Sequence, residues 1–191
     1  MSINLFEPYT NPITGETFEC TSFTPERYRM KWTVAPGGYV PLEHVHYFQD
    51  EIFYVQSGTL NLRIDGVDHL VKTGEQITAP KGKSHIADNR GDGELICDVE
   101  YVPGLDYYTF FQCFIGLQMD KDYNKKGQIN IPKMAYFMKA TKCNALARPS
   151  AIPKPMFLFV LNIFWVIGSI AGWKKQLKRH VGEQVETETT V

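Results

Sequence analysis

The sequence lacks the features of an exported, disulfide-stabilised protein. Its amino terminus, Met-Ser-Ile-Asn-Leu-Phe-Glu-Pro, has neither a basic flank nor an apolar stretch, so no signal peptide is predicted. The four cysteines (Cys20, Cys97, Cys113 and Cys143) are widely spaced and include no CxxC pair. We therefore expect reduced, unpaired thiols and a cytoplasmic location for the amino-terminal part.

Charge and chain-breaking residues are distributed unevenly along the chain. Residues 1–104 carry 8 Lys+Arg and 15 Asp+Glu, whereas residues 105–191 carry 12 and 6, so a net charge of −7 precedes one of +6. Most glycines and prolines lie before residue 105. This shift predicts two parts, a domain over residues 1–104 and an extension over residues 105–180, before a disordered acidic tail at 181–191. An acidic first part argues against nucleic-acid binding.

The first part has the pattern of short strands joined by turns. Residues 1–26 contain turn signals and are expected to pair along a sheet edge or to cover an open end. Alternation of apolar and polar residues predicts strands at Tyr28–Val34, at Thr59–Ile64 before the Asp65-Gly66 turn, and at Gln76–Ala79. Seven or more such strands predict a mainly β fold, a sandwich or small barrel.

The extension has a helical pattern. Residues 105–119 contain few chain-breaking residues and several aromatics, which predicts a docked helix. Pro132 suits the first turn of a helix that would run to about Arg148. Residues 156–173 are 18 residues without a charge, which predicts a hydrophobic helix.

A metal site is predicted in the stretch between Gly38 and Gly58. His44 and His46 are separated by one residue, so in a strand both side chains project from the same face. Glu51 follows five positions after His46, and a neighbouring strand could bring its carboxylate to the same point. Two imidazoles and a carboxylate are donors for a first-row transition metal.

Two motifs in this region closely resemble those of the cupin superfamily. The first has the pattern G-x5-HxH-x4-E-x6-G and the second G-x5-PxG-x2-H-x3-N; they are met by Gly38, His44, His46, Glu51 and Gly58, and by Gly74, Pro80, Gly82, His85 and Asn89. The resemblance covers about residues 28–102. It implies a jelly-roll-like β-barrel of antiparallel strands, with the extension as C-terminal α-helices. By position, it also implies four metal ligands: His44, His46, Glu51 and His85.

The expected cofactor is one divalent transition metal ion (Fe, Mn, Ni, Cu or Zn), because the donor set suits all five. An intact ligand set favours a metal-dependent enzyme of oxidoreductase or dioxygenase type acting on a small organic molecule, with Glu51 also as a catalytic proton carrier. The alternative is a non-catalytic module that binds or senses a small molecule at the membrane surface. A sugar-nucleotide isomerase is a weaker reading. Met30, Trp32, Tyr54 and Ile64 are expected as barrel lining that could contact a hydrophobic substrate.

Three interpretations compete for residues 156–173: a transmembrane helix, a helix at the membrane interface, or a helix buried in a dimer or against the barrel. Basic residues lie on both sides of the segment, so a helix in the interface plane fits a cytoplasmic barrel best. Membrane lipid is therefore an expected partner, and a homodimer is a further one. Pro103-Gly-Leu-Asp and the late Gly168-x-x-x-Gly172 are similar to small bacterial cupin proteins with a helical extension.

Overall fold

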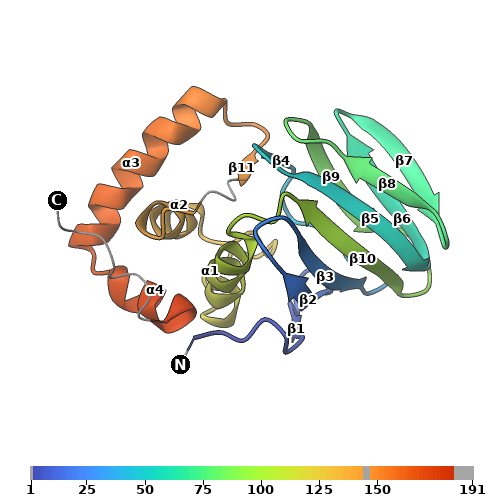
Figure 1. The fold of residues 1–191 in the computed structure, drawn as a ribbon, viewed down its shortest axis with the longest axis horizontal. Coiled ribbons are helices and arrows are strands. Elements are labelled where there is room, and N and C mark those ends of the chain that lie inside the picture. Colours follow the sequence, from blue (N-terminus) through green and yellow to red (C-terminus); the bar gives the residue numbers. More distant parts are fainter. Residues whose placement is uncertain (1, 144–146, 183–191) are drawn as a thin grey trace.

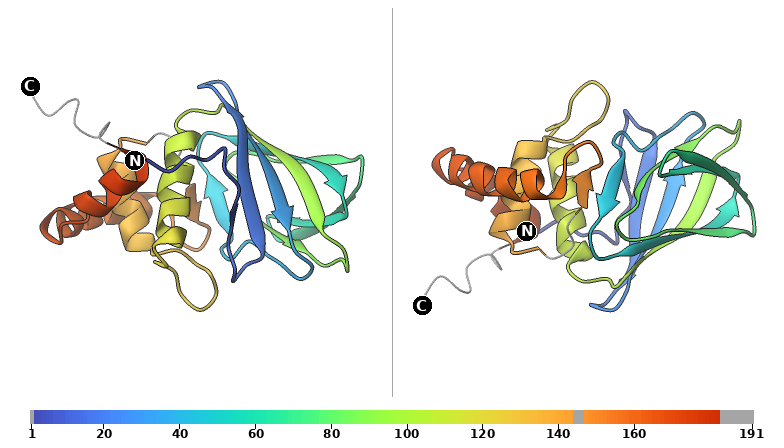
Figure 2. Two further views of the ribbon diagram at one scale, coloured as in Figure 1. Left: turned by 90° about the horizontal axis from the view of Figure 1, so that it is seen from below. Right: turned by 90° about the horizontal axis from the view of Figure 1, so that it is seen from above.

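The computed structural model describes residues 2–143 and 147–182 and consists of a β-barrel beside a group of helices. Figure 1 shows the barrel at the right of the molecule and the helices at the left. The two views in Figure 2 show the same arrangement, with helix α1 lying across one end of the barrel.

The barrel is built from two antiparallel sheets. Their strands are β1 (Tyr9–Thr10), β2 (Glu16–Phe23), β3 (Tyr28–Val34), β4 (His44–His46), β5 (Asp50–Ser57), β6 (Thr59–Ile64), β7 (Val67–Lys72), β8 (Gln76–Ala79), β9 (Ser84–Asn89), β10 (Leu95–Val102) and β11 (Ala147–Pro149). One sheet has the order β1-β2-β3-β10-β5-β8 and the other β11-β4-β9-β6-β7. The predicted mainly β barrel followed by helices is confirmed.

Strands β3, β6 and β8 have the bounds expected from the alternation of their residues. In β3, Met30 and Trp32 are buried while Arg29 and Lys31 are exposed, so one face enters the core and the other meets water. The lead-in also pairs as expected, because β2 forms an antiparallel ladder with β3 and β1 adds to its outer edge.

The helices are α1 (Tyr107–Met119), α2 (Ile131–Ala140), α3 (Lys154–Ile170) and α4 (Lys174–Val181). The prediction that the second helix continues to Arg148 is wrong. Thr141 caps α2, and Lys142 has a left-handed backbone with φ of 52°, which ends the helix. Ala147–Pro149 then returns as strand β11, which pairs with β4.

The predicted hydrophobic helix at 156–173 is shifted in the structure. Helix α3 begins two residues earlier, at Lys154, and ends three residues earlier, at Ile170. Gly172 has φ of +73°, and α4 starts at Lys174 at 100° to α3. Within the described ranges no single helix is long and apolar enough to cross a membrane; only α3 and α4 together, as a bent pair, meet that criterion. Of the predicted tail at 181–191, residues 183–191 lie outside the described residues.

Gly168 explains the close approach of α3 and α2. A Cβ at this position would lie 2.4 Å from a ring atom of Tyr136 in α2, so only glycine fits there. Gly172 is instead a turn residue with positive φ. The Gly168-x-x-x-Gly172 pattern thus serves packing and a turn within this chain.

Two glycines of the motifs allow a matched test of why glycine is needed. Gly58 and Gly74 both have positive φ, +82° and +85°, but a Cβ at Gly58 would also lie 2.8 Å from the Glu94 carbonyl oxygen, whereas Gly74 has nothing within 4 Å. Alanine at Gly74 should cost about 1 kcal/mol of unfolding free energy, and alanine at Gly58 roughly 2 kcal/mol more. Urea unfolding measures both; equal losses would contradict the steric part of this account.

Candidate metal centre

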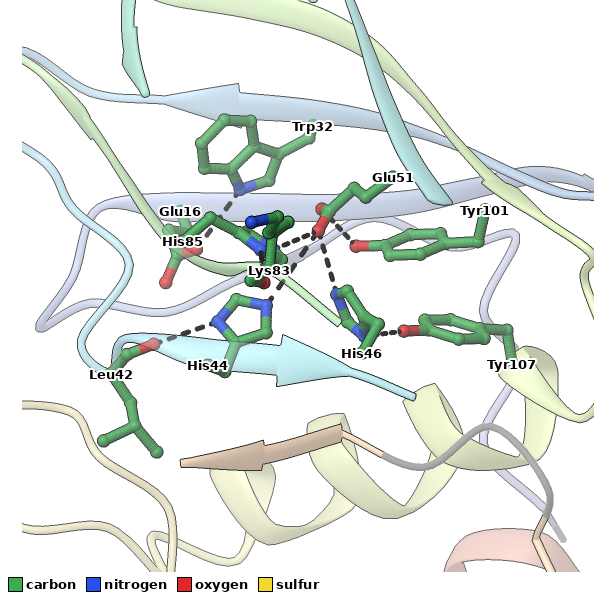
Figure 3. A network of polar contacts seen from close by, with 10 residues as sticks. All are labelled: Glu16, Trp32, Leu42, His44, His46, Glu51, Lys83, His85, Tyr101 and Tyr107. Atoms are coloured by element: carbon green, nitrogen blue, oxygen red, sulfur yellow. Dashed lines mark hydrogen bonds and ion pairs between the residues drawn. The ribbon is translucent and has the colours of Figure 1, made fainter. Parts of the chain in front are cut away.

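Three histidines and one glutamate converge at one point inside the barrel. His44 and His46 lie on β4, Glu51 on β5 and His85 on β9, and one donor atom of each lies within 4.8 Å of the others. The strand register causes this convergence, because His44 pairs directly with His85. This cluster could hold a metal ion. Figure 3 shows the imidazoles of His44 and His46 rising from β4 toward the carboxylate of Glu51.

The carboxylate of Glu51 is the centre of the cluster. Its Oε2 lies 2.9 Å from His46 Nε2, 2.8 Å from His85 Nε2 and 3.9 Å from His44 Nε2. All three histidines therefore present the same ring nitrogen to the site. A divalent ion bound among these atoms would replace direct contacts between them by coordination.

The opposite ring nitrogen of each histidine is held by the protein. Nδ1 of His44 donates to the Leu42 carbonyl at 3.0 Å, and Nδ1 of His85 donates to the Lys83 carbonyl at 3.2 Å. In His44 the proton on Nδ1 leaves the Nε2 lone pair directed into the site, which is the tautomer that binds a metal. Nε2 of His46 and Nε2 of His85 instead carry protons that Glu51 accepts, and a bound metal ion would displace them.

Two tyrosines complete the surroundings of the cluster. The hydroxyl of Tyr101 donates to Glu51 Oε1 at 2.7 Å, and Nδ1 of His46 is hydrogen-bonded to the Tyr107 hydroxyl at 2.5 Å. Burial raises the pKa of both tyrosines well above its usual value, so both hydroxyls are protonated near neutrality. These partners orient Glu51 and His46 as outer-sphere groups orient metal ligands.

The electrostatics of the cluster suit a metal. Burial, with the neighbouring histidines, lowers the pKa of His44 to about 3, and burial also lowers the pKa of His46. Burial alone would raise the pKa of Glu51, but hydrogen bonds from His46 and His85 hold it well below its usual value. At His85 burial alone would lower the pKa, but the hydrogen bond and charge of Glu51 raise it. Near neutral pH the cluster thus offers neutral imidazoles at His44 and His46 and an ionised carboxylate, and a bound metal ion would displace a proton from His85.

A cavity of about 150 Å³ adjoins the four donors. Strands from both sheets form its walls, and the helical extension covers part of it with aromatic and methionine side chains from α1, α2 and α3: Tyr107, Phe110, Phe111, Phe114, Met134, Met138 and Phe157. The strand β11 lies against β4 at the same end (Figure 3). The extension is therefore part of the wall around the candidate site.

The remaining lining is mostly apolar. Met30 and Trp32 line the cavity as expected, whereas Tyr54 and Ile64 are not among its lining residues. Arg148 is the single lysine or arginine among the described lining residues, and its Nη1 donates to the carbonyls of Pro149, Ser150 and Ile152. The cavity thus suits a small molecule that is largely apolar.

Glu16 lines the cavity but was not predicted as a site residue. Glu16, the first residue of β2, is 2% exposed and faces the cavity. It shares the inward face of β2 with Phe18 and Cys20, while Thr17 and Glu19 alternate outward. The alternation Glu-x-Phe-x-Cys in the sequence could have indicated that Glu16 faces inward. Glutamate is rarely buried in proteins, however, so it is normally predicted to be exposed.

Comparison with known proteins gives a short sequence match and several fold-level likenesses. Protein SchB of Streptomyces halstedii is 36% identical over 61 residues, which are 32% of this chain and 44% of that protein. The match thus spans less than half of the relative.

The solved structures that resemble this chain cover about half of it. An uncharacterised conserved protein with a double-stranded β-helix domain from Klebsiella pneumoniae is 26% identical (50% of this chain, 84% of that one, TM-score 0.45). A sugar phosphate isomerase from Silicibacter pomeroyi is 24% identical (47% and 60%, TM-score 0.43), and KdgF from Halomonas sp. is 18% identical (53% and 92%, TM-score 0.43). TM-scores below 0.5 carry no argument about the activity of this chain.

The family model of the cupin domain matches residues 30–100. This range contains all four clustered donors and both predicted motifs, and it lies within the resemblance predicted for residues 28–102. Asn89, the last residue of the second motif, has a structural role, since its amide donates to the carbonyls of Val34, Ala35 and Gly93. Residues 30–100 of this chain therefore form a cupin domain.

Proposed function

We propose that this chain is a mononuclear metal-dependent enzyme of oxidoreductase or dioxygenase type, acting on a small and mainly apolar molecule. The observation that carries the proposal is the convergence of His44, His46, Glu51 and His85 on one point beside the largely apolar cavity. When bound, a divalent transition metal ion would supply Lewis acidity or electron transfer there. The aromatic walls would exclude water and orient the substrate.

Glu51 is proposed both as a ligand and as the carrier of a proton. Its Oε1 is anchored by Tyr101, while its Oε2 faces the three histidines. A proton passing between the carboxylate and a substrate would use Oε2 once that oxygen has moved off the metal, with Tyr101 holding Oε1 in place.

The lining supports an apolar substrate over a sugar phosphate. A phosphate group needs cations or several backbone N–H donors, and the described lining offers one arginine, Arg148, whose Nη1 already donates to three carbonyls and whose buried Nε has no partner. A volume of about 150 Å³ is close to that of an engineered cavity that binds benzene. A molecule with one small ring fits this space.

Metal binding is tested by removing one donor. The His85→Ala variant should retain less than about a tenth of the metal found in the wild type, because the other three donors cannot complete the site. Added Zn²⁺ at 100 times its Kd should stabilise the wild type by about 2.7 kcal/mol and leave the variant almost unchanged. Elemental analysis and thermal unfolding measure the two effects.

His69→Ala is the matched control, because His69 lies on the exposed strand β7 outside the cluster. It should keep the metal content and the zinc-dependent stabilisation. A wild type that neither carries nor takes up metal, or an unchanged His85→Ala variant, would refute the metal site.

The reaction type is tested by oxygen consumption. Protein loaded with Fe(II), Mn(II), Ni(II) or Cu(II) should consume dioxygen with at least one small phenol, thiol or 1,3-diketone, and the His85→Ala variant should not. An oxygen electrode measures the rate. Metal-loaded protein that binds such a compound without consuming oxygen would favour the alternative function, a non-catalytic module that binds or senses a small molecule.

We also propose that helix α3 lies on an anionic lipid surface. Its outer face is apolar, with exposed Met156, Leu158, Phe159, Ile163, Trp165, Val166, Ile167 and Ile170, the last of these 84% exposed. An exposed apolar patch of this kind marks an interaction site. Packing on α2 covers the inner face at Phe157, Leu161 and Gly168.

Charge favours lipid as the occupant of this face. Residues 123–182 contain 11 Lys+Arg and neither Asp nor Glu, so the segment around α3 is strongly basic. At 17 residues the helix is about 25 Å long, and a position in the plane of the interface needs no crossing. A second copy of the chain, which would be equally basic, would be repelled.

Vesicle binding tests the lipid surface. The chain should bind vesicles of phosphatidylcholine with phosphatidylglycerol more tightly than phosphatidylcholine alone, and Phe159→Glu with Ile170→Glu should weaken that binding more than tenfold by removing buried apolar area. Phe23→Glu is the matched control, because Phe23 is a 48% exposed phenylalanine on β2, outside both α3 and the barrel edge at β7. Flotation assays measure binding. No binding to either vesicle would contradict the proposal, and a dimer that the double variant dissociates would assign the face to a second copy.

The predicted homodimer through the barrel edge is a separate proposal. Strand β7 is the outer strand of its sheet and exposes Val67 and Leu70, which supports pairing there. Light scattering of the Leu70→Glu variant checks it, and a wild type that is monomeric in solution would contradict it.

A further inference from the structure

We propose that Glu16 hydrogen-bonds an acceptor oxygen of the molecule bound in the barrel cavity, as a polar contact separate from the four metal-binding donors. This inference rests on the proposed function, since it names the chemistry of the ligand in the same cavity. It adds a residue from β2, outside both cupin motifs.

The position of Glu16 fits this role. It is the first residue of β2, pairs with Val34 of β3, and faces inward beside Phe18. Glu16 lines the same cavity as Glu51 and His85. Figure 3 shows its carboxyl group beneath the indole of Trp32, in the region of the histidines.

The two oxygens of Glu16 have different partners. Oε1 accepts a 3.2 Å hydrogen bond from Trp32 Nε1, whereas Oε2 is fully buried and has no hydrogen-bond partner. The Thr14 hydroxyl lies near the carboxyl group and lowers its pKa, but its geometry does not make it a hydrogen-bond partner of Oε2. A buried oxygen left unpaired destabilises a fold, and such groups persist where a ligand supplies the missing partner.

The carboxyl group of Glu16 acts as a hydrogen-bond donor through Oε2. Burial raises the pKa of Glu16 to about 8, so near neutral pH the group carries a proton. Because Oε1 accepts from the indole, the hydroxyl is on Oε2, which donates into the cavity. The partner is therefore an acceptor oxygen, such as that of a ketone, an enol or a phenol.

The rest of the lining limits the ligand to one such contact at this end. Phe18, Met30 and Phe53 surround the space with apolar atoms, and they offer no hydrogen bond to a second polar group. A sugar with several hydroxyls would lose hydration without replacement. The ligand class is thus a small, neutral ring or chain with a single oxygen directed at Glu16.

Two fluorinated probes of nearly equal shape test this contact. 4-Fluorophenol has an acceptor oxygen and fluorobenzene has none, and ¹⁹F NMR titration of zinc-treated protein measures both affinities. The wild type should prefer 4-fluorophenol by about tenfold, the typical value of a hydrogen bond to a buried group. In Glu16→Leu the preference should fall below about twofold.

Glu16→Gln is the conservative variant that should keep the preference. Its amide oxygen can accept from Trp32 while its amide nitrogen donates into the cavity, as the protonated carboxyl does. Glu100→Gln is the matched control, since Glu100 is a largely buried glutamate that pairs with Arg27 and Arg29 outside the cavity. It should leave the preference unchanged.

The outcomes separate this inference from the proposed function. Zinc content, measured on the same samples, reports on the metal site alone. If the wild type binds no metal but still prefers 4-fluorophenol through Glu16, the enzyme proposal fails and the Glu16 contact stands. Zinc-loaded protein that binds both probes equally would overturn the Glu16 contact, however Glu16→Leu folds. Failure of both probes to bind, or a Glu16→Leu variant that keeps the full preference, would overturn it as well.

Discussion

The carboxylate of Glu51 is the constraint around which the centre of the barrel is organised. A buried carboxylate is costly unless each oxygen has partners, and here Tyr101 satisfies one oxygen while His46 and His85 satisfy the other. The same contacts bring the three Nε2 atoms together, because each imidazole is fixed from behind through Nδ1. The same contacts therefore stabilise the ionised carboxylate and bring together the donor atoms that could bind a cation.

The helical extension belongs to the site as much as the barrel does. Tyr107 of α1 bonds to His46, β11 pairs with the strand that carries two of the histidines, and Phe157 of α3 lines the cavity. The barrel by itself would open this apolar space to water. Packing of the extension over the cavity keeps water away from it, which lowers the local dielectric and strengthens the electrostatic contacts between the lining residues.

The two faces of α3 have different surroundings. Its inner face is buried against α2 and ends at the cavity, whereas its outer face leaves large apolar side chains in water. A single helix therefore lies between the proposed lipid surface and the candidate site. Phe157 is the one α3 side chain that lines the cavity among those described.

The sequence alone predicted whatever depends on local spacing. Strand β3 follows from alternation, the pairing of His44 with His46 on one face follows from their separation by one residue, and the match of His85 to the second motif follows from fixed offsets. Tertiary structure decided what depends on distant segments. The unpaired oxygen of Glu16, the bond of Tyr107 to His46 and the strand at Ala147–Pro149 arise from packing between elements far apart in the chain, which no local pattern encodes. Helix α2 ends at Ala140 for a local reason, the cap at Thr141 and the left-handed backbone of Lys142.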